Sequence, residues 1–143
     1  AGTGRFFDVL ARVFEVTLND LGLMSLHAKD RITISSTCTV FAESEVVSLM
    51  ARGQDPMSII NGIHFSFARR IAGLVNRVGV VKEVSMTGGT AKNVGMRALL
   101  EELLEIKLVP LKIDPQLTGA LGAALFAKER SKAMGKTAAP CQR

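Results

Sequence analysis

The second half of the chain alternates between segments typical of strands and segments typical of helices, and this order restricts the fold more than any other feature. Residues 83–87 predict a strand and residues 94–104 a helix. Residues 107–111 predict a second strand, and a helix rich in small residues follows Asp114-Pro115. The strand–helix–strand–helix order predicts an α/β fold in which helices pack on a partly parallel sheet.

The first half of the chain is dominated by helical patterns. The predicted order is a helix over 3–16, a turn-rich connection over 17–30, an extended segment over 31–36, a helix over 39–52 and a long helix over 56–78. Asp55 and Pro56 are a good N-cap and first-turn pair for the long helix. Gly53 and Gly79 are expected to end the last two helices.

A glycine turn separates the first predicted strand from the helix that Asn93 would cap. Gly88 and Gly89 lack a Cβ, so a ligand can approach their backbone closely, and helix N–H groups nearby can meet a phosphate or nucleotide edge. A plain connecting turn is the alternative interpretation. The turn is neither a Walker A loop nor a Rossmann fingerprint, because Lys92 lacks the required glycine and hydroxyl spacing.

The helix after Asp114-Pro115 has a face of small residues. Gly119, Gly122 and Ala123 are spaced by three and four residues, so something is expected to approach that face closely. Tight packing on the sheet and contact with a nucleotide are both compatible with the pattern. Open α/β sheets place ligands near the carboxyl ends of their strands, where this helix and the glycine turn both begin.

Cys38 lies where an extended stretch gives way to a helix. A thiolate at a helix N-terminus lies at the positive end of the helix dipole, which favours ionisation and therefore metal binding or nucleophilic attack. The alternative is that Cys38 is a small apolar core residue. Ile34, Val46 and other apolar residues are expected to form the core beneath it; the full set is Ile34, Val40, Phe41, Val46 and Val47.

Charge and cysteine content exclude several classes of protein. Residues 128–143 hold five of the 18 basic residues and one of the 13 acidic ones, so residues 1–127 are nearly neutral. A nucleic-acid-binding face is therefore unsupported. The two cysteines, Cys38 and Cys141, do not have the spacing of a disulfide framework. They favour a reducing, cytoplasmic setting. No apolar run is long enough for a membrane span.

Five segments carry a resemblance to a known family over residues 1 to about 127. In order they are GTGRFFDVLARVFEV, ISSTCTVFAESEVVSLMARG, GIHFSFARRIAGL, MTGGTAKN and DPQLTGALGAALFA. Together they resemble the ATPase activators (component A) of 2-hydroxyacyl-CoA dehydratases and the related ATPase subunits of benzoyl-CoA reductase. Five ordered motifs are more specific than any one of them alone.

The resemblance implies an actin-like, hexokinase-like (ribonuclease H-like) ATPase fold. Residues 1–127 look like its C-terminal lobe without the N-terminal lobe, and residues 128–143 look like a basic, flexible tail. The family implies a homodimer that shares one [4Fe–4S] cluster between subunits. ATP and Mg²⁺ would drive a single electron from the cluster into a dehydratase or reductase component, which are the expected partners.

The same resemblance assigns site residues. Cys38 matches the second of two cluster cysteines, and the first is expected two residues before Ala1. Four thiolates are needed, so this chain alone is not expected to assemble a normal cluster. The phosphate loop and Mg²⁺ carboxylates of the family are also lacking, so no catalytic residue is assigned and the fragment is expected to be inactive. The resemblance places the adenosine side of the nucleotide at Thr87, Gly88, Gly89, Thr90, Ala91 and Gln116.

Two other functions remain open at this point: an iron-free small-molecule kinase of the same superfamily, and a non-catalytic dimerisation module. His27 and His64 have no second ligand at metal spacing and are expected on the surface or in helix packing. Arg69 and Arg70 either pair with local carboxylates or steer an acidic partner.

Overall fold

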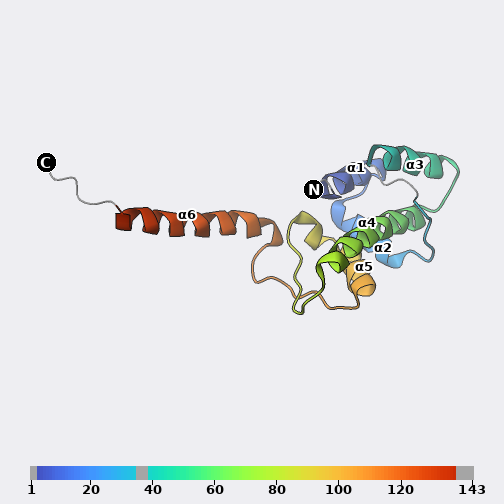
Figure 1. The fold of residues 1–143 in the computed structure, drawn as a ribbon. Helices are drawn as coiled ribbons and strands as arrows, with labels where there is room; N and C mark the ends of the chain where they lie inside the picture. Colours follow the sequence, from blue (N-terminus) through green and yellow to red (C-terminus); the bar gives the residue numbers. More distant parts are fainter. Residues whose placement is uncertain (1–2, 35–38, 138–143) are drawn as a thin grey trace.

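A computed structural model describes residues 3–34 and 39–137 of the chain. The elements are α1 (Thr3–Val13), α2 (Leu18–His27), α3 (Thr39–Ala51), α4 (Pro56–Val78), the 3₁₀-helix η1 (Gly89–Lys92), α5 (Val94–Leu104), the 3₁₀-helix η2 (Pro115–Leu117) and α6 (Thr118–Thr137). Helices α1 to α5 gather into one body, and α6 extends away from it (Figure 1).

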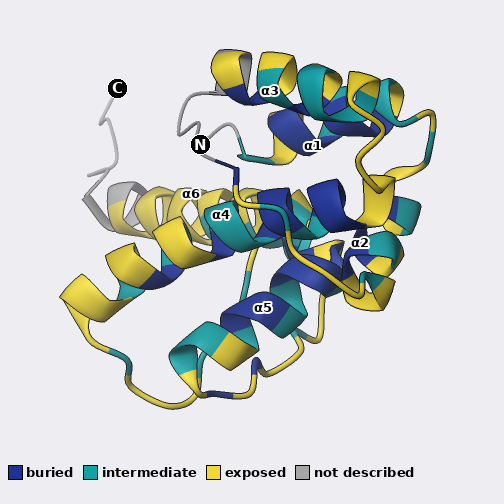
Figure 2. Cartoon of the chain, turned by 90° about the vertical axis from the view of Figure 1, so that its right-hand side faces the viewer, coloured by how far each residue is buried: buried dark blue, intermediate teal, exposed yellow. Residues whose placement is uncertain are grey.

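The core lies where α2, α4 and α5 pack on one another, with α1 against α2 and α3. The inward faces of these helices are buried, whereas the C-terminal part of α4 is largely exposed (Figure 2). Leu21, Ile60 and Met96 are fully buried at the centre. A Cβ on Gly95 would lie 2.9 Å from the carbonyl oxygen of Gly22, so the small residue allows α2 and α5 to cross closely.

The capping signals read from the sequence are confirmed. The Asp55 side chain accepts a hydrogen bond from the backbone N–H of Ser58 at 2.8 Å, and α4 begins at Pro56. The Asn93 side chain accepts one from the N–H of Met96 at 3.0 Å, and α5 begins at the next residue. Because each cap satisfies a donor that the first helical turn leaves unpaired, it fixes where the helix starts.

The turn-rich connection predicted over residues 17–30 is wrong, because most of it forms α2. Thr17 and Asp20 make a capping box: the Thr17 hydroxyl accepts from the N–H of Asp20, and the Asp20 carboxylate accepts from the N–H of Thr17. Two otherwise unpaired donors are satisfied reciprocally, which stabilises a helix whose sequence suggests turns.

The predicted sheet is reduced, in the described residues, to one parallel bridge between Val84 and Leu108. The N–H of Val109 donates to the carbonyl of Val84 at 2.8 Å. The two predicted strands therefore lie side by side in the expected parallel sense, but neither extends into a ladder. Residues 31–34 form no strand either; the N–H of Ile32 donates to the Ser58 carbonyl of α4 instead. Two short segments without further partners are too few to sustain a sheet.

The core predicted beneath Cys38 is only partly correct. Ile34 and Val46 are buried, but Phe41 is 68% exposed and Val47 51% exposed. On a helix, Ala42 and Val46 share one face, and Phe41 and Val47 lie away from it. The side chain of Val40 is outside the described residues. The first helix also ends earlier than predicted, at Val13, because Glu15 adopts a left-handed conformation with φ 55°.

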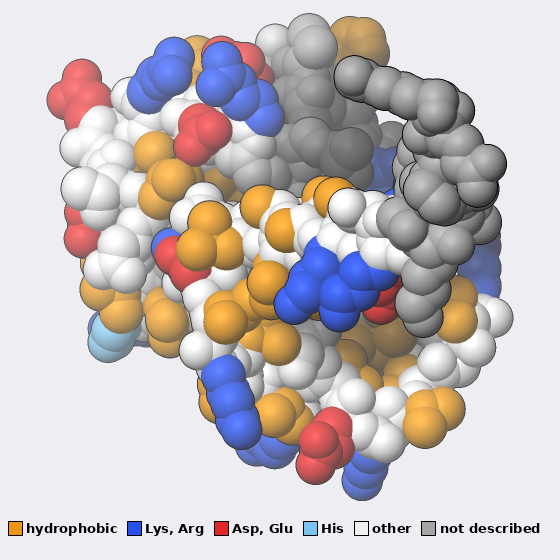
Figure 3. All heavy atoms as spheres, turned by 90° about the vertical axis from the view of Figure 1, so that its left-hand side faces the viewer, with side chains coloured by type: hydrophobic (Ala, Val, Ile, Leu, Met, Phe, Trp, Pro, Cys, Tyr) orange, Lys and Arg blue, Asp and Glu red, His pale blue; other side chains and the backbone are white. Residues whose placement is uncertain are grey.

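Helix α6 begins at Thr118 rather than at Asp114-Pro115, which open the short turn η2. A Cβ added at Gly119 or Gly122 would meet nothing within 4 Å, so neither the sheet nor any other described residue covers the small-residue face. Hydrophobic side chains are exposed on the side of the molecule from which α6 projects (Figure 3). Leu121, Leu125 and Phe126 are among the exposed apolar residues of this helix. The helix continues through residues 128–137, and the flexibility of residues 128–143 stays a prediction.

Candidate functional site

A cavity of about 520 Å³ lies where the glycine turn, η2, α1 and the start of α2 meet. We call it the glycine-turn cavity; it is lined by Gly4, Phe7, Asp8, Leu18, Asn19, Gly89, Thr90, Lys92, Asn93 and Gln116. Gly88 makes this arrangement possible, because its φ of 86° is a conformation that side chains disfavour. Its N–H donates to the Pro115 carbonyl at 2.9 Å, which joins the turn to η2.

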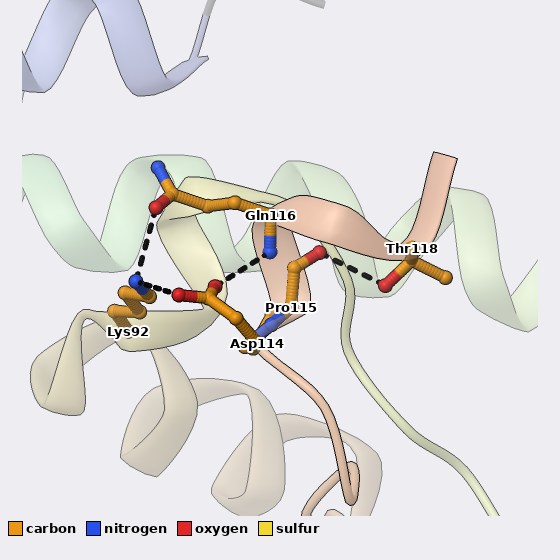
Figure 4. Close-up of polar contacts among 5 residues, drawn as sticks. All are labelled: Lys92, Asp114, Pro115, Gln116 and Thr118. Carbon is orange, nitrogen blue, oxygen red and sulfur yellow. Dashed lines mark hydrogen bonds and ion pairs between the residues drawn. The ribbon is translucent and has the colours of Figure 1, made fainter. Parts of the chain in front are cut away.

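Lys92, Asp114 and Gln116 form a polar network at one edge of the cavity (Figure 4). The Lys92 ammonium donates to Oδ2 of Asp114 at 2.7 Å and to Oε1 of Gln116 at 3.0 Å. The other carboxylate oxygen of Asp114 accepts from the backbone N–H of Gln116 at 2.9 Å. The network therefore fixes both the backbone and the side chain of Gln116.

The Lys92 contact also determines which end of the Gln116 amide is available. An ammonium group can only donate, so Gln116 turns its carbonyl oxygen to Lys92 and keeps its NH₂ group as a donor. A Cβ built on Gly89 would lie 3.1 Å from that Nε2 atom. The Gln116 amide and the glycine backbone therefore face each other closely, with no room for a side chain between them.

The cavity has no excess of positive charge. Hydrogen bonding to Lys92 holds the pKa of Asp114 below its usual range, so the carboxylate stays ionised and offsets the lysine charge. Asp8 is the other charged residue of the described lining, and it is acidic. A triphosphate needs concentrated positive charge, whereas an uncharged, aromatic group with hydrogen-bonding edges suits this cavity better.

A buried histidine, His64, contacts two residues that line the cavity, Phe7 and Asn93. His64 of α4 is fully buried, and its ring lies 4.6 Å from that of Phe7, centroid to centroid. Its Nδ1 donates to the Ile60 carbonyl at 2.8 Å, which leaves Nε2 to accept from the Asn93 side chain at 3.0 Å. Burial lowers the pKa of His64 to about 4, so the ring is neutral at pH 7. The expected helix-packing role of His64 is confirmed, and His27 is exposed on α2.

The structure brings together half of the residues that the sequence assigned to the adenosine side. Gly89, Thr90 and Gln116 line the glycine-turn cavity, and Gly88 shapes the turn. Ala91 is buried, and Thr87 is exposed outside the lining. Three other lining residues were not predicted as site residues from the sequence: Asp8, Asn19 and Lys92. The spacing of Lys92 to the Asp114-Pro115-Gln116 run gave no signal, because their contact depends on the fold.

Cys38, the predicted metal ligand, lies outside the described residues. Among the described residues no three His, Cys, Asp or Glu side chains gather into a group that could hold a metal ion. The described helices include none that is both long and apolar enough to cross a bilayer.

Comparison with known proteins places the chain among ATPases. Residues 1–127 match the BadF/BadG/BcrA/BcrD ATPase family. The chain is 55% identical over 133 residues to the (R)-2-hydroxyglutaryl-CoA dehydratase activating ATPase of Acidaminococcus fermentans, covering 92% of this chain and 50% of the relative. It is 49% identical over 133 residues to the 2-hydroxyisocaproyl-CoA dehydratase activator of Clostridioides difficile, covering 92% of this chain and 49% of the relative.

A solved structure shows the same similarity in three dimensions. The activator of the 2-hydroxyisocaproyl-CoA dehydratase from Clostridium difficile, with bound ADPNP, superimposes with a TM-score of 0.82 at 43% identity. The match covers 100% of this chain and 53% of that one. The chain thus spans about half the length of the relatives it matches.

Proposed function

The chain belongs to the BadF/BadG/BcrA/BcrD ATPase family, and from this we propose that it is part of an ATP-driven electron donor that activates a 2-hydroxyacyl-CoA dehydratase. The identities of 55% and 49% to two dehydratase activators support this assignment. The fold we propose for the complete protein is the actin-like ATPase fold, with residues 1–127 as its C-terminal lobe.

The observation that carries the proposal is the glycine-turn cavity. It places the backbone of Gly89, which has no side chain, next to a fixed donor, Nε2 of Gln116, and its lining includes the apolar residues Phe7 and Leu18. These features fit a purine and its ribose: the ring can lie against apolar surface, and the amide can donate to a nucleotide acceptor. The lack of excess positive charge supports the adenosine side rather than the phosphates, which a different part of the complete protein would bind with Mg²⁺.

The proposal gives a smaller role to the remaining assigned residues, which do not line the cavity: Thr87, Gly88 and Ala91. Gly88 and Ala91 would act through the shape of the turn, because the first has a positive φ and the second is buried. Thr87 is exposed beside the turn. We propose that it contacts the nucleotide only at the rim of the cavity.

The electron-donor part of the proposal rests on Cys38. We propose that Cys38 is one of two cysteines from each subunit that hold a [4Fe–4S] cluster at the interface of a homodimer in the cytoplasm. The group would supply a low-potential electron when bound. In the sequence, Cys38 directly precedes Thr39, the first residue of α3.

Activity of the complete, anaerobically purified protein tests the proposed function. The protein, a one-electron reductant and MgATP are added to an inactive 2-hydroxyacyl-CoA dehydratase, and the unsaturated acyl-CoA product is measured. Product should form with ATP and not with ADPNP, because hydrolysis is expected to drive the transfer.

The outcomes separate the alternatives. ATP hydrolysis without dehydratase activation, but with reduction of an aryl-CoA in the presence of reductase components, would show a benzoyl-CoA reductase subunit. Phosphate transfer to a small molecule by iron-free protein would show a kinase. Either result would overturn the proposal.

A further inference from the structure

A second hollow, far richer in arginine than the glycine-turn cavity, runs along α4. Its volume is about 690 Å³, and it lies between α4, the segment 31–34, α1 and the start of α3. Four arginines line it: Arg31, Arg69, Arg70 and Arg77. No Asp or Glu is among the described residues that line it. We call it the arginine groove.

The arginines of α4 share one face of the helix. Arg70, Gly73 and Arg77 are separated by three and four residues, which places them in one row, and Arg69 is adjacent. All three arginines are exposed. The ion pairs among the described residues join Lys92 to Asp114 and Lys107 to Glu101, so Arg69, Arg70 and Arg77 have no carboxylate partner in this part of the chain.

Arg31 is held in place by two residues of α4. Its guanidinium lies 3.7 Å from the centre of the Phe65 ring, and its Nε donates to Oδ1 of Asn61 at 2.7 Å. Stacking on the aromatic face fixes the guanidinium plane and leaves its remaining N–H groups as donors. An arginine oriented before binding loses less conformational entropy when it meets a carboxylate.

The spacing and the floor of the groove limit what can fill it. Seven residues of helix separate Arg70 from Arg77, which corresponds to roughly 10 Å along the axis. Separate contacts with each arginine require negative charges spread over this length. The floor is apolar, formed in part by Phe6, Ile34 and Phe65. The occupant must therefore present several negative charges over this length together with apolar side chains.

We propose that the arginine groove docks an acidic segment of the protein that receives the electron. This inference rests on the proposed function. Ile34 lines the groove, and Cys38 is four positions further along the sequence. Charge complementarity would speed association and fix the orientation in which the partner binds.

Charge reversal tests the inference in the complete protein. The double variant Arg70→Glu/Arg77→Glu should bind the dehydratase at least tenfold more weakly in a titration at low salt. Its affinity should also vary less with salt concentration. The control, Arg52→Glu/Lys112→Glu, reverses two exposed charges outside the groove and should bind within twofold of the wild type. ATP hydrolysis without the partner should be unchanged in both, because neither pair lines the glycine-turn cavity.

Each other outcome overturns the inference in a recognisable way. Equal loss in both double variants would show a general charge effect, and unchanged binding in both would show that docking occurs elsewhere. A changed oligomeric state with normal dehydratase affinity would assign the groove to a second copy of the chain. Coenzyme A binding that is lost in Arg70→Gln/Arg77→Gln would assign it to a small anionic ligand. If the wild-type protein neither binds nor activates a dehydratase, the proposed function fails, not the groove alone.

Discussion

Asn93 donates a side-chain hydrogen bond to Nε2 of the buried His64 at 3.0 Å, and the same side chain caps α5. One amide therefore fixes the start of α5, the ring orientation of a histidine on α4 and one wall of the glycine-turn cavity. The ring of Phe7, on α1, packs against the same histidine. His64 thus connects Phe7 of α1 with Asn93, and both of these residues line the cavity.

The His64 environment predicts a stability that falls with acid. Because burial lowers the pKa of His64 from 6.5 to about 4, the unfolded chain binds the extra proton first as the pH falls. The contribution is complete above pH 6.5 and is lost progressively towards pH 4. Between pH 7 and pH 5 the free energy of unfolding of the complete protein should drop by about 2 kcal/mol.

Urea unfolding at the two pH values measures this change. The pKa values of Asp20, Asp55, Glu101 and Asp114 are all lowered from ordinary values near 4, so these groups add little in this window. His64→Gln should be less stable at pH 7 but should lose the dependence. A variant that keeps the full dependence would show that another group is responsible.

Gly89→Val should weaken ADP binding at least tenfold in the complete protein. The new Cβ would lie 3.1 Å from Nε2 of Gln116, so the valine must displace either the glutamine or the nucleotide. Calorimetry with ADP measures the affinity. Gly73→Val is the matched control, because a Cβ there meets nothing within 4 Å and the residue is outside the cavity. Normal ADP binding by Gly89→Val would show that the glycine only completes the turn.

Lys92→Met should lower the affinity for a nucleotide while the stability of the fold changes little. The Lys92–Asp114 pair is about half exposed, so its removal should change the free energy of unfolding only slightly. Gln116, however, would lose the contact that orients its amide. ADP affinity should fall, and Gln116→Leu should lower it at least as much. If Lys92→Met lost affinity and Gln116→Leu did not, the lysine itself would be the contact with the nucleotide.

Cys38→Ala should remove the iron from the complete protein purified without oxygen, while circular dichroism stays unchanged. The reason is that a [4Fe–4S] cluster held by four thiolates does not survive the loss of two of them in a dimer. Cys141→Ala provides the control, since this cysteine belongs to no family motif, and it should keep its iron. Normal iron content in Cys38→Ala would rule out the assignment of this residue.

Prediction from the sequence succeeded where the determining contacts are local. Asp55 and Asn93 bind N–H groups three residues away, so the first residues of α4 and α5 follow from the sequence. The capping box of Thr17 and Asp20 is equally local, but it lies among residues that resemble turns and was overlooked. The sequence therefore does contain a start signal for α2, but the turn-like residues around it favour the wrong prediction.

Contacts between distant residues were harder to predict. The parallel sense of Val84 and Leu108 followed from the strand–helix–strand order, but the length of the pairing depends on neighbouring strands that the described residues do not supply. Lys92 and Asp114 are separated by 22 positions, and no periodicity links them. Residues that shape the cavity from α1, such as Phe7 and Asp8, resemble ordinary helical residues in the sequence.

The carbonyl oxygen of Pro115 accepts two hydrogen bonds, one from the N–H of Gly88 at 2.9 Å and one from the Thr118 hydroxyl at 3.0 Å. A single atom therefore acts as the pivot between the glycine turn and the first residue of α6. The described residues leave the small-residue face of α6 uncovered, and the hydrogen bond of Thr118 ties the first residue of this helix to the turn. A change in the tilt of α6 would therefore act on the same carbonyl that holds the glycine turn in place beside Gln116.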